Sequence, residues 1–316
     1  MRSYLALTIT SVLMLALSCA PPPAPPAISS PQSNGGQTPS GGEAGFPITI
    51  TDETGREFSL QKEPQRLVSL SAHNTEILYA LNLEERVVAV DDYSDYPPAV
   101  EDKPRVGGFS SPDLEKIIAA EPDLVLASNI HTKKIVGELE RHGLKVMVAD
   151  SPDVKGVLDR IRLVGKATGR IQEAEALTNS MKARINAVEA RMTGVKPVRV
   201  FYELSPTLHT AGSGTFMDDM IRVAGGINVA ADAGKGWPQI NQEALFLSDP
   251  EVILLGDHSA GETPEQVMAR PGWNQITAVK DGRVHVVDPN LANRPGPRVV
   301  DGLDMVAKFI HPEKYQ

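Results

Sequence analysis

One stretch of this 316-residue chain occurs twice, and the repeat constrains the fold more than any other feature of the sequence. Residues 115–126 align with residues 243–254, and each copy predicts a short helix, an acidic-Pro-acidic turn and a buried strand. Proline ends each helix because it lacks the amide donor and clashes with the preceding turn. A second echo, between residues 145–150 and 283–288, follows in the same order. Two echoes in one order predict a duplicated α/β lobe, with chance similarity between generic α/β segments as the alternative.

Short β-branched runs alternate with helical patterns in both halves of the chain, which is typical of βαβ units and parallel sheets. The expected strands are 67–70, 87–90, 124–127 and 145–148, then 198–202, 252–255 and 283–287.

Between the two sets of strands, residues 171–193 contain neither Gly nor Pro, and apolar residues recur at steps of three or four. This pattern predicts one helix about 33 Å long, at 1.5 Å per residue, which is more than a crossover needs. A stiff helix that joins two lobes permits small rocking and resists wide hinge opening.

The N-terminal residues are expected to serve export rather than the fold. Arg2 and the apolar stretch of residues 5–17 are typical of a signal peptide, which ends here at the only cysteine, Cys19. Residues 16–19 are similar to the lipobox of bacterial lipoproteins, in which the cysteine is lipidated, although Ala16 stands where Leu is usual. We therefore interpret residues 1–19 as a lipoprotein signal peptide, with an ordinary signal peptide as the alternative. Residues 20–45, rich in Pro, Gly and Ser, predict a disordered tether.

The bulk composition narrows the class of protein. The chain is 41% hydrophobic and 22% charged, which is typical of a globular protein. Its formal net charge of -9 argues against nucleic acid or anionic lipid headgroups as main partners, because both need a basic surface. A single cysteine leaves no intrachain disulfide, and after the signal peptide no apolar run is long enough to cross a bilayer. We expect a monomer.

Several short motifs follow one another in a recognisable order and spacing. They are residues 66–76 (RLVSLSAHNTE), 93–98 (YSDYPP), 107–109 (GGF), the 115 repeat, 225–228 (GGIN), 237–240 (WPQI), the 243 repeat and 294–298 (RPGPR).

With these motifs the chain resembles, from about Ile48 to the C-terminus, the periplasmic binding proteins of the vitamin B12, iron-siderophore and haem importers. The resemblance implies an α/β fold in which two Rossmann-like lobes with parallel sheets are bridged by one long α-helix. We place the N-terminal lobe at 46–168, the bridging helix at 169–194 and the C-terminal lobe at 195–316.

Within that family the chain is most similar to the vitamin B12 binders, in which aromatic side chains of both lobes hold the corrin ring. Tyr93, Phe109 and Trp237 fall on such positions, and flat rings give a large contact face for a planar macrocycle. The alternative is that these rings lie in the cores of the lobes. Ser128 and His209 replace further aromatic residues of the pattern.

Polar candidates complete the expected site. Arg294 can bind a phosphate, carboxylate or amide with two hydrogen bonds, or it can simply be a surface residue at a helix start. Asn290 stands where the pattern has an aspartate. His209 can offer a nitrogen to a metal, although a lone histidine in a loop is more often a hydrogen-bonding residue.

Glu115 and Glu243 lie at the same place in the internal repeat. In the resembled family one glutamate on each lobe meets arginines of the permease, so we predict that these two dock the protein on the permease–ATPase complex. The alternative is that both are favoured as acidic residues at helix starts.

Two rival classes of protein make different demands on the sequence. A zinc or manganese binder would use His73, His131, His209 and Asp288, but a His-rich loop is absent and the aromatic set would have no purpose. An exported enzyme would need a catalytic constellation, and no Gly-x-Ser-x-Gly, Ser-x-x-Lys or His-Glu-x-x-His occurs.

We therefore expect no enzyme activity, no resident cofactor and no metal site. The expected function is that of an exported, lipid-anchored component of an ABC importer that captures a small molecule. We rank a corrinoid (vitamin B12) first and a ferric siderophore or haem second. The anchor would hold the protein at the outer face of the cytoplasmic membrane or in the periplasm.

Overall fold

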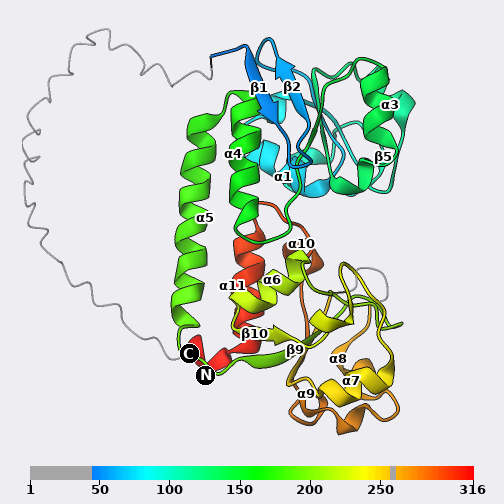
Figure 1. Cartoon of the computed structure of the whole chain (residues 1–316), viewed down its shortest axis with the longest axis vertical. Coiled ribbons are helices and arrows are strands. Elements are labelled where there is room, and N and C mark those ends of the chain that lie inside the picture. Colours follow the sequence, from blue (N-terminus) through cyan, green and yellow to red (C-terminus); the bar gives the residue numbers. More distant parts are fainter. Residues whose placement is uncertain (1–44, 257–260) are drawn as a thin grey trace, which may run out of the picture. The chain divides into compact units, whose positions relative to one another are not determined.

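The computed structural model describes residues 45–256 and 261–316 (Figure 1). The described residues all belong to one compact unit. The predicted signal peptide, lipidated Cys19 and most of the tether lie outside the described residues.

Two four-stranded parallel sheets carry the fold. The first has the order β4 (Val87–Val90), β3 (Leu67–Ser69), β7 (Leu124–Ala127), β8 (Val146–Val148). The second has the order β10 (Gly226–Asn228), β9 (Val198–Glu203), β11 (Val252–Leu255), β12 (Val284–Val286). Both sheets therefore have the same topology: from one edge to the other, the strands are the second, first, third and fourth of that sheet along the chain. The α/β fold with two parallel sheets is confirmed, and β10 is a strand that the sequence did not predict.

Two short antiparallel pairs accompany the first sheet: β1 (Ile48–Thr51) with β2 (Glu57–Leu60), and β5 (Gly107–Gly108) with β6 (Ser111–Pro112). The helices are α1 (Ala72–Ala80), α2 (Leu114–Ala119), α3 (Ile135–Arg141), α4 (Gly156–Thr168), α5 (Ile171–Arg191), α6 (Phe216–Val223), α7 (Gln242–Ser248), α8 (Pro264–Met268), α9 (Thr277–Lys280), α10 (Pro289–Ala292) and α11 (Val299–Ile310).

Helix α5 is the long connection that the sequence predicted (Figure 1). It packs against α4 and α11, and its buried side chains recur at steps of three or four along one face. The turn between α4 and α5 is tight: Gly169 has a φ of 73°, and a Cβ on Gly165 would lie 2.4 Å from the Cβ of Ala174. One continuous hydrophobic cluster includes Leu67 of the first sheet, Ile185 of α5 and Val200 of the second sheet. The joint between the lobes is therefore packed, as a stiff bridge requires.

The duplication extends to details of the backbone. Asp113 caps α2 by accepting from the N–H of Lys116, and Asn241 caps α7 by accepting from the N–H of Ala244. After these helices Glu121 has a φ of 46° and Asp249 a φ of 40°, both in the left-handed region.

An arginine side chain then holds each turn. Arg66 donates from Nε to the carbonyl of Glu121 at 2.9 Å, and Arg199 donates in the same way to the carbonyl of Asp249 at 2.8 Å. These matched contacts indicate that the two lobes are copies of one unit.

Within the described ranges, every helix is too short or too polar to traverse a lipid bilayer.

Candidate ligand-binding site

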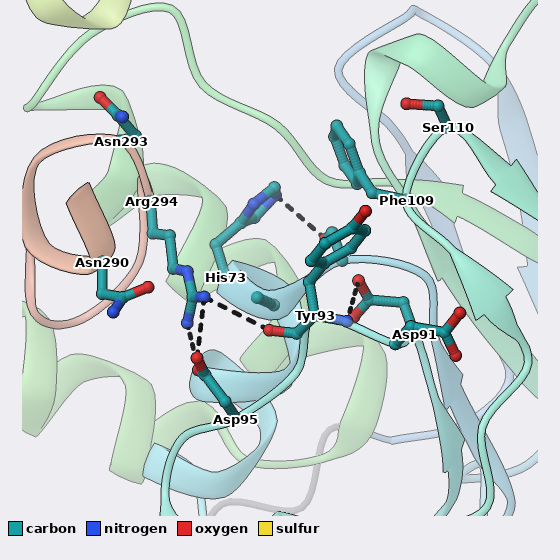
Figure 2. A pocket seen from close by; sticks show the side chains of 12 residues that line it. His73, Asp91, Tyr93, Asp95, Phe109, Ser110, Asn290, Asn293 and Arg294 are labelled. Atoms are coloured by element: carbon teal, nitrogen blue, oxygen red, sulfur yellow. Dashed lines mark hydrogen bonds and ion pairs between the residues drawn. The ribbon is translucent and has the colours of Figure 1, made fainter. Parts of the chain in front are cut away.

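A cavity of about 690 Å³ lies where β3 and β4 of the first sheet end, beside α10 (Figure 2). Loops that follow the carboxyl ends of parallel strands are the usual ligand site of such sheets. Four of the six predicted ligand-binding residues line this cavity, namely Tyr93, Phe109, Asn290 and Arg294. The other lining residues are Ser71, Ala72, His73, Asp91, Asp92, Asp95, Ser110 and Asn293.

Tyr93 lies on the loop after β4 with 62% of its surface exposed. Its position is fixed through the main chain, because its N–H donates to Asp91 Oδ2 at 3.2 Å. Asp91 in turn accepts from the hydroxyl of Ser94 at 2.5 Å. The phenol ring is thus held by its backbone and left open on the cavity side (Figure 2). It does not belong to the core of the lobe.

Phe109 is half-buried and lies on the loop between β5 and β6. Its ring packs edge-on against His131, with ring centroids 5.4 Å apart. The His131 ring accepts from the N–H of Ser128 at Nδ1, and its Nε2 lies 2.6 Å from the Phe109 carbonyl, to which it donates. Burial lowers the pKa of His131, so the ring stays neutral. It holds Phe109 through the edge-on ring contact and the hydrogen bond to the Phe109 carbonyl.

Arg294 reaches the cavity from the C-terminal part of the chain. Its guanidinium donates to Asp95 at 2.5 and 3.2 Å and to the Tyr93 carbonyl at 3.3 Å (Figure 2). The hydrogen bond and charge of Arg294 lower the pKa of Asp95, so this carboxylate is ionised at neutral pH. The sequence singled out Arg294 but not Asp95, which lies 199 positions away in the chain.

Acidic groups outnumber basic groups in the cavity wall. Asp91, Asp92 and Asp95 lie along the loop after β4, and Arg294 is the one guanidinium among the lining residues. Burial raises the pKa of Asp91, which nevertheless keeps its hydrogen bonds from Ser94 and the Tyr93 N–H. The cavity therefore presents a negative surface to a ligand, mainly through the exposed Asp92 and Asp95, and the one guanidinium among its described lining residues is already paired.

The segment that carries Arg294 is fastened to the first lobe at further points. Arg298 donates to both oxygens of Glu76 on α1, at 2.9 and 2.6 Å, and its guanidinium carbon lies 3.9 Å from the centre of the Tyr96 ring. Arg160 of α4 donates to the Pro295 carbonyl at 3.3 Å. A second connection between the lobes therefore exists beside α5, and it fixes one wall of the cavity.

His73 also lines the cavity, whereas the sequence favoured a purely structural role for it in the loop after β3. The ring is almost fully buried, and its Nε2 lies 3.2 Å from the Ser71 hydroxyl. Burial lowers the pKa of His73 to about 4, so the ring is neutral at physiological pH despite the nearby charge of Asp150.

His209 and Trp237 do not line this cavity. Both belong to loops that follow the carboxyl ends of β9 and β10 in the second sheet, where main-chain bonds such as Thr210 N–H to the Pro238 carbonyl join the loops. His209 Nδ1 lies 3.0 Å from the Thr207 hydroxyl. Trp237 is 49% exposed and is not a core residue. A ligand role for either residue stays a prediction.

The four ligands of the rival metal site do not come together. Both ring nitrogens of His131 have main-chain partners, and Asp288 caps α10 by accepting from the N–H of Asn290. Within residues 45–256 and 261–316, no cluster of three or more His, Cys, Asp or Glu side chains could hold a metal ion.

Glu115 and Glu243 lie in the first turns of α2 and α7, and both are exposed. No ion pair involving either carboxylate is found among the described residues, so both are available to a cationic partner.

Comparisons with known proteins agree with this fold. A family model described as a periplasmic binding protein matches residues 67–291. A relative from Bacillus subtilis (strain 168), named as an uncharacterized ABC transporter substrate-binding lipoprotein, YvrC, is 35% identical over 280 residues, which are 86% of this chain and 88% of the relative.

Two solved structures superpose with a TM-score of 0.71 each. One is the periplasmic vitamin B12 binding protein BtuF of Vibrio cholerae, at 26% identity, covering 80% of this chain and 99% of that one. The other is the periplasmic heme-binding protein RhuT from Roseiflexus sp. RS-1 in apo form, at 28% identity and the same coverage. The chain therefore belongs to the periplasmic binding protein family, as the substrate-binding component of an ABC importer of the vitamin B12, siderophore and haem type.

Proposed function

We propose that this protein is the exported, lipid-anchored receptor of its importer and that it captures a corrinoid in the cavity beside Tyr93. It carries the ligand to the permease and performs no reaction on it. The observation that supports this best is the character of the cavity wall, where an open aromatic ring lies among carboxylates that outnumber the one guanidinium.

The aromatic groups suit a flat macrocycle. Tyr93 presents an exposed ring on a main chain that Asp91 holds in place, and Phe109 lines the same cavity. Rigid rings give a large apolar contact at a small cost in conformational entropy, which favours a planar ligand.

The charges favour a corrinoid over the other ligands of this family. Amide groups surround a corrin ring, and they can donate hydrogen bonds to the exposed carboxylates of Asp92 and Asp95. The propionates of haem and the oxygen donors of many siderophores are anionic, and the same carboxylates repel them. An anionic ligand would also have to displace Asp95 from Arg294.

The second lobe would complete the grip on the ligand. Trp237 is half-exposed on a loop at the carboxyl end of its sheet, and His209 lies on the neighbouring loop. When ligand is bound, we expect Trp237 to cover the face of the ring opposite Tyr93.

Delivery requires the protein to stay near its permease. Cys19 would carry the lipid, residues 20–45 would act as the tether, and Glu115 and Glu243 would meet basic side chains of the permease. The lipoprotein name of the Bacillus subtilis relative supports the anchor, and the exposed, unpaired carboxylates among the described residues support the docking role.

A calorimetric titration of the mature protein tests the ligand assignment. Cyanocobalamin, haem, a ferric hydroxamate, a ferric catecholate, zinc and manganese are the ligands to compare. We expect saturable 1:1 binding of cyanocobalamin, with Tyr93→Ala weakening it and Tyr93→Phe retaining it because the ring remains. Tight binding of haem or a siderophore without cyanocobalamin binding would make the corrinoid assignment wrong.

A further inference from the structure

The two helices that carry the docking glutamates present matched but unequal outer faces. On α2 the exposed residues are Glu115, Lys116 and Ala119, and on α7 the repeat-equivalent exposed residues are Glu243, Ala244 and Leu247. The equivalence is firm because the caps before these helices and the left-handed residues after them also match.

The α7 face combines an acid with an apolar side chain. Leu247 is 89% exposed, more than any other large hydrophobic side chain in the described ranges. It lies four positions after Glu243, so the two side chains emerge on the same side of the helix. A single exposed leucine is ordinary on a protein surface, but this one adjoins a carboxylate without an ion pair among the described residues.

The α2 face offers less apolar surface. The position equivalent to Leu247 is Ala119, which offers little apolar surface. The position equivalent to Ala244 is Lys116, whose ammonium lies 3.8 Å from Asp113 and next to Glu115 in the chain. Because Lys116 pairs with Asp113, whose repeat equivalent Asn241 is uncharged, each face keeps one uncompensated carboxylate, and the two faces differ in their apolar surface.

We propose that the protein docks asymmetrically, with the α7 face of Glu243, Ala244 and Leu247 as the dominant contact on the permease. Leu247 enters an apolar depression beside the cation that receives Glu243, whereas α2 contributes charge alone. This inference rests on the proposed docking role of Glu115 and Glu243. The expected partner surface on a permease subunit is a basic side chain bordered by apolar residues.

The test measures the affinity of the ligand-loaded mature protein for its permease–ATPase complex in nanodiscs. Leu247→Gln is expected to weaken binding by roughly tenfold or more, the equivalent of burying one leucine side chain. Ile227→Gln is the matched control, because Ile227 is exposed on β10 of the same lobe and should leave the affinity unchanged. Glu243→Gln should cost more affinity than Glu115→Gln, because the contact of Leu247 shields the neighbouring Glu243 ion pair from water.

The outcomes separate this inference from the docking proposal itself. If both glutamate substitutions weaken binding equally and Leu247→Gln has no effect, docking is symmetric and the inference is wrong. If neither glutamate substitution has an effect, the docking proposal fails as well. If Leu247→Gln instead abolishes self-association in sedimentation while permease affinity is unchanged, Leu247 contacts a second copy of this chain and the inference is also wrong.

Discussion

Replacing Arg298 by methionine tests whether the second connection between the lobes stabilises the protein. Glu76 has 4% of its surface exposed, and Arg298 satisfies both of its carboxylate oxygens at 2.9 and 2.6 Å. Removal of one partner from a fully buried ion pair costs about 3–5 kcal/mol, because the other charge stays buried without compensation.

Two features of the structure reduce that cost. The Arg298 side chain is 20% exposed, and Arg294 Nη1 remains 3.6 Å from Glu76 Oε1 after the substitution. Loss of the guanidinium from the face of Tyr96 adds about 0.5–1 kcal/mol. We therefore expect Arg298→Met to lower the free energy of unfolding by about 2–3 kcal/mol.

Urea unfolding at pH 7, followed by circular dichroism, measures the change. The control is the double variant Glu76→Met with Arg298→Met, which removes both charges and should recover most of the lost stability. A loss below about 0.5 kcal/mol in the single variant, or a double variant as unstable as the single one, would refute the role given to this ion pair.

Three further predictions follow from single positions. His73 has a pKa of about 4 in the folded protein and about 6.5 in the unfolded chain. Between these pH values the unfolded chain binds more protons than the folded protein does. The free energy of unfolding should therefore fall by about 3 kcal/mol as the pH drops from 6.5 to 4. His73→Gln should flatten this pH dependence in urea titrations, and an unchanged slope would contradict it. Trp237→Ala should leave the melting temperature unchanged because the ring is half-exposed, whereas a large drop would make it a core residue. Gly212→Ala should disturb the loop of Trp237, because its Cβ would meet the Gly234 carbonyl, and indole fluorescence should report the change; an unaltered spectrum would speak against it.

The architecture could be predicted because it depends on local and repeated patterns. Short segments of sequence are enough to recognise the helical period of residues 171–191 and the acidic-Pro-acidic turns. The internal repeat predicts the duplicated lobe. Strand β10 was missed because its three residues, which begin with a glycine, carry no β-branched run.

The site was harder to predict because its contacts are distant in the chain. Asp95 meets Arg294 across 199 positions and Glu76 meets Arg298 across 222, and no local pattern indicates either pair. His73 could be recognised as a residue after a strand, but its burial in the cavity wall depends on how the C-terminal segment packs on the first lobe. The resemblance to B12 binders supplied Tyr93, Phe109, Asn290 and Arg294, which the fold brings to one cavity, whereas His209 and Trp237 do not line it.

A crystal structure of the mature protein grown with cyanocobalamin tests the central claim most directly, because the anomalous signal of cobalt locates the ligand. The cobalt should lie in the cavity beside Tyr93, with the corrin plane against that ring and Arg294 still bound to Asp95. A cobalt peak elsewhere on the protein, or none at a saturating concentration, would contradict the account.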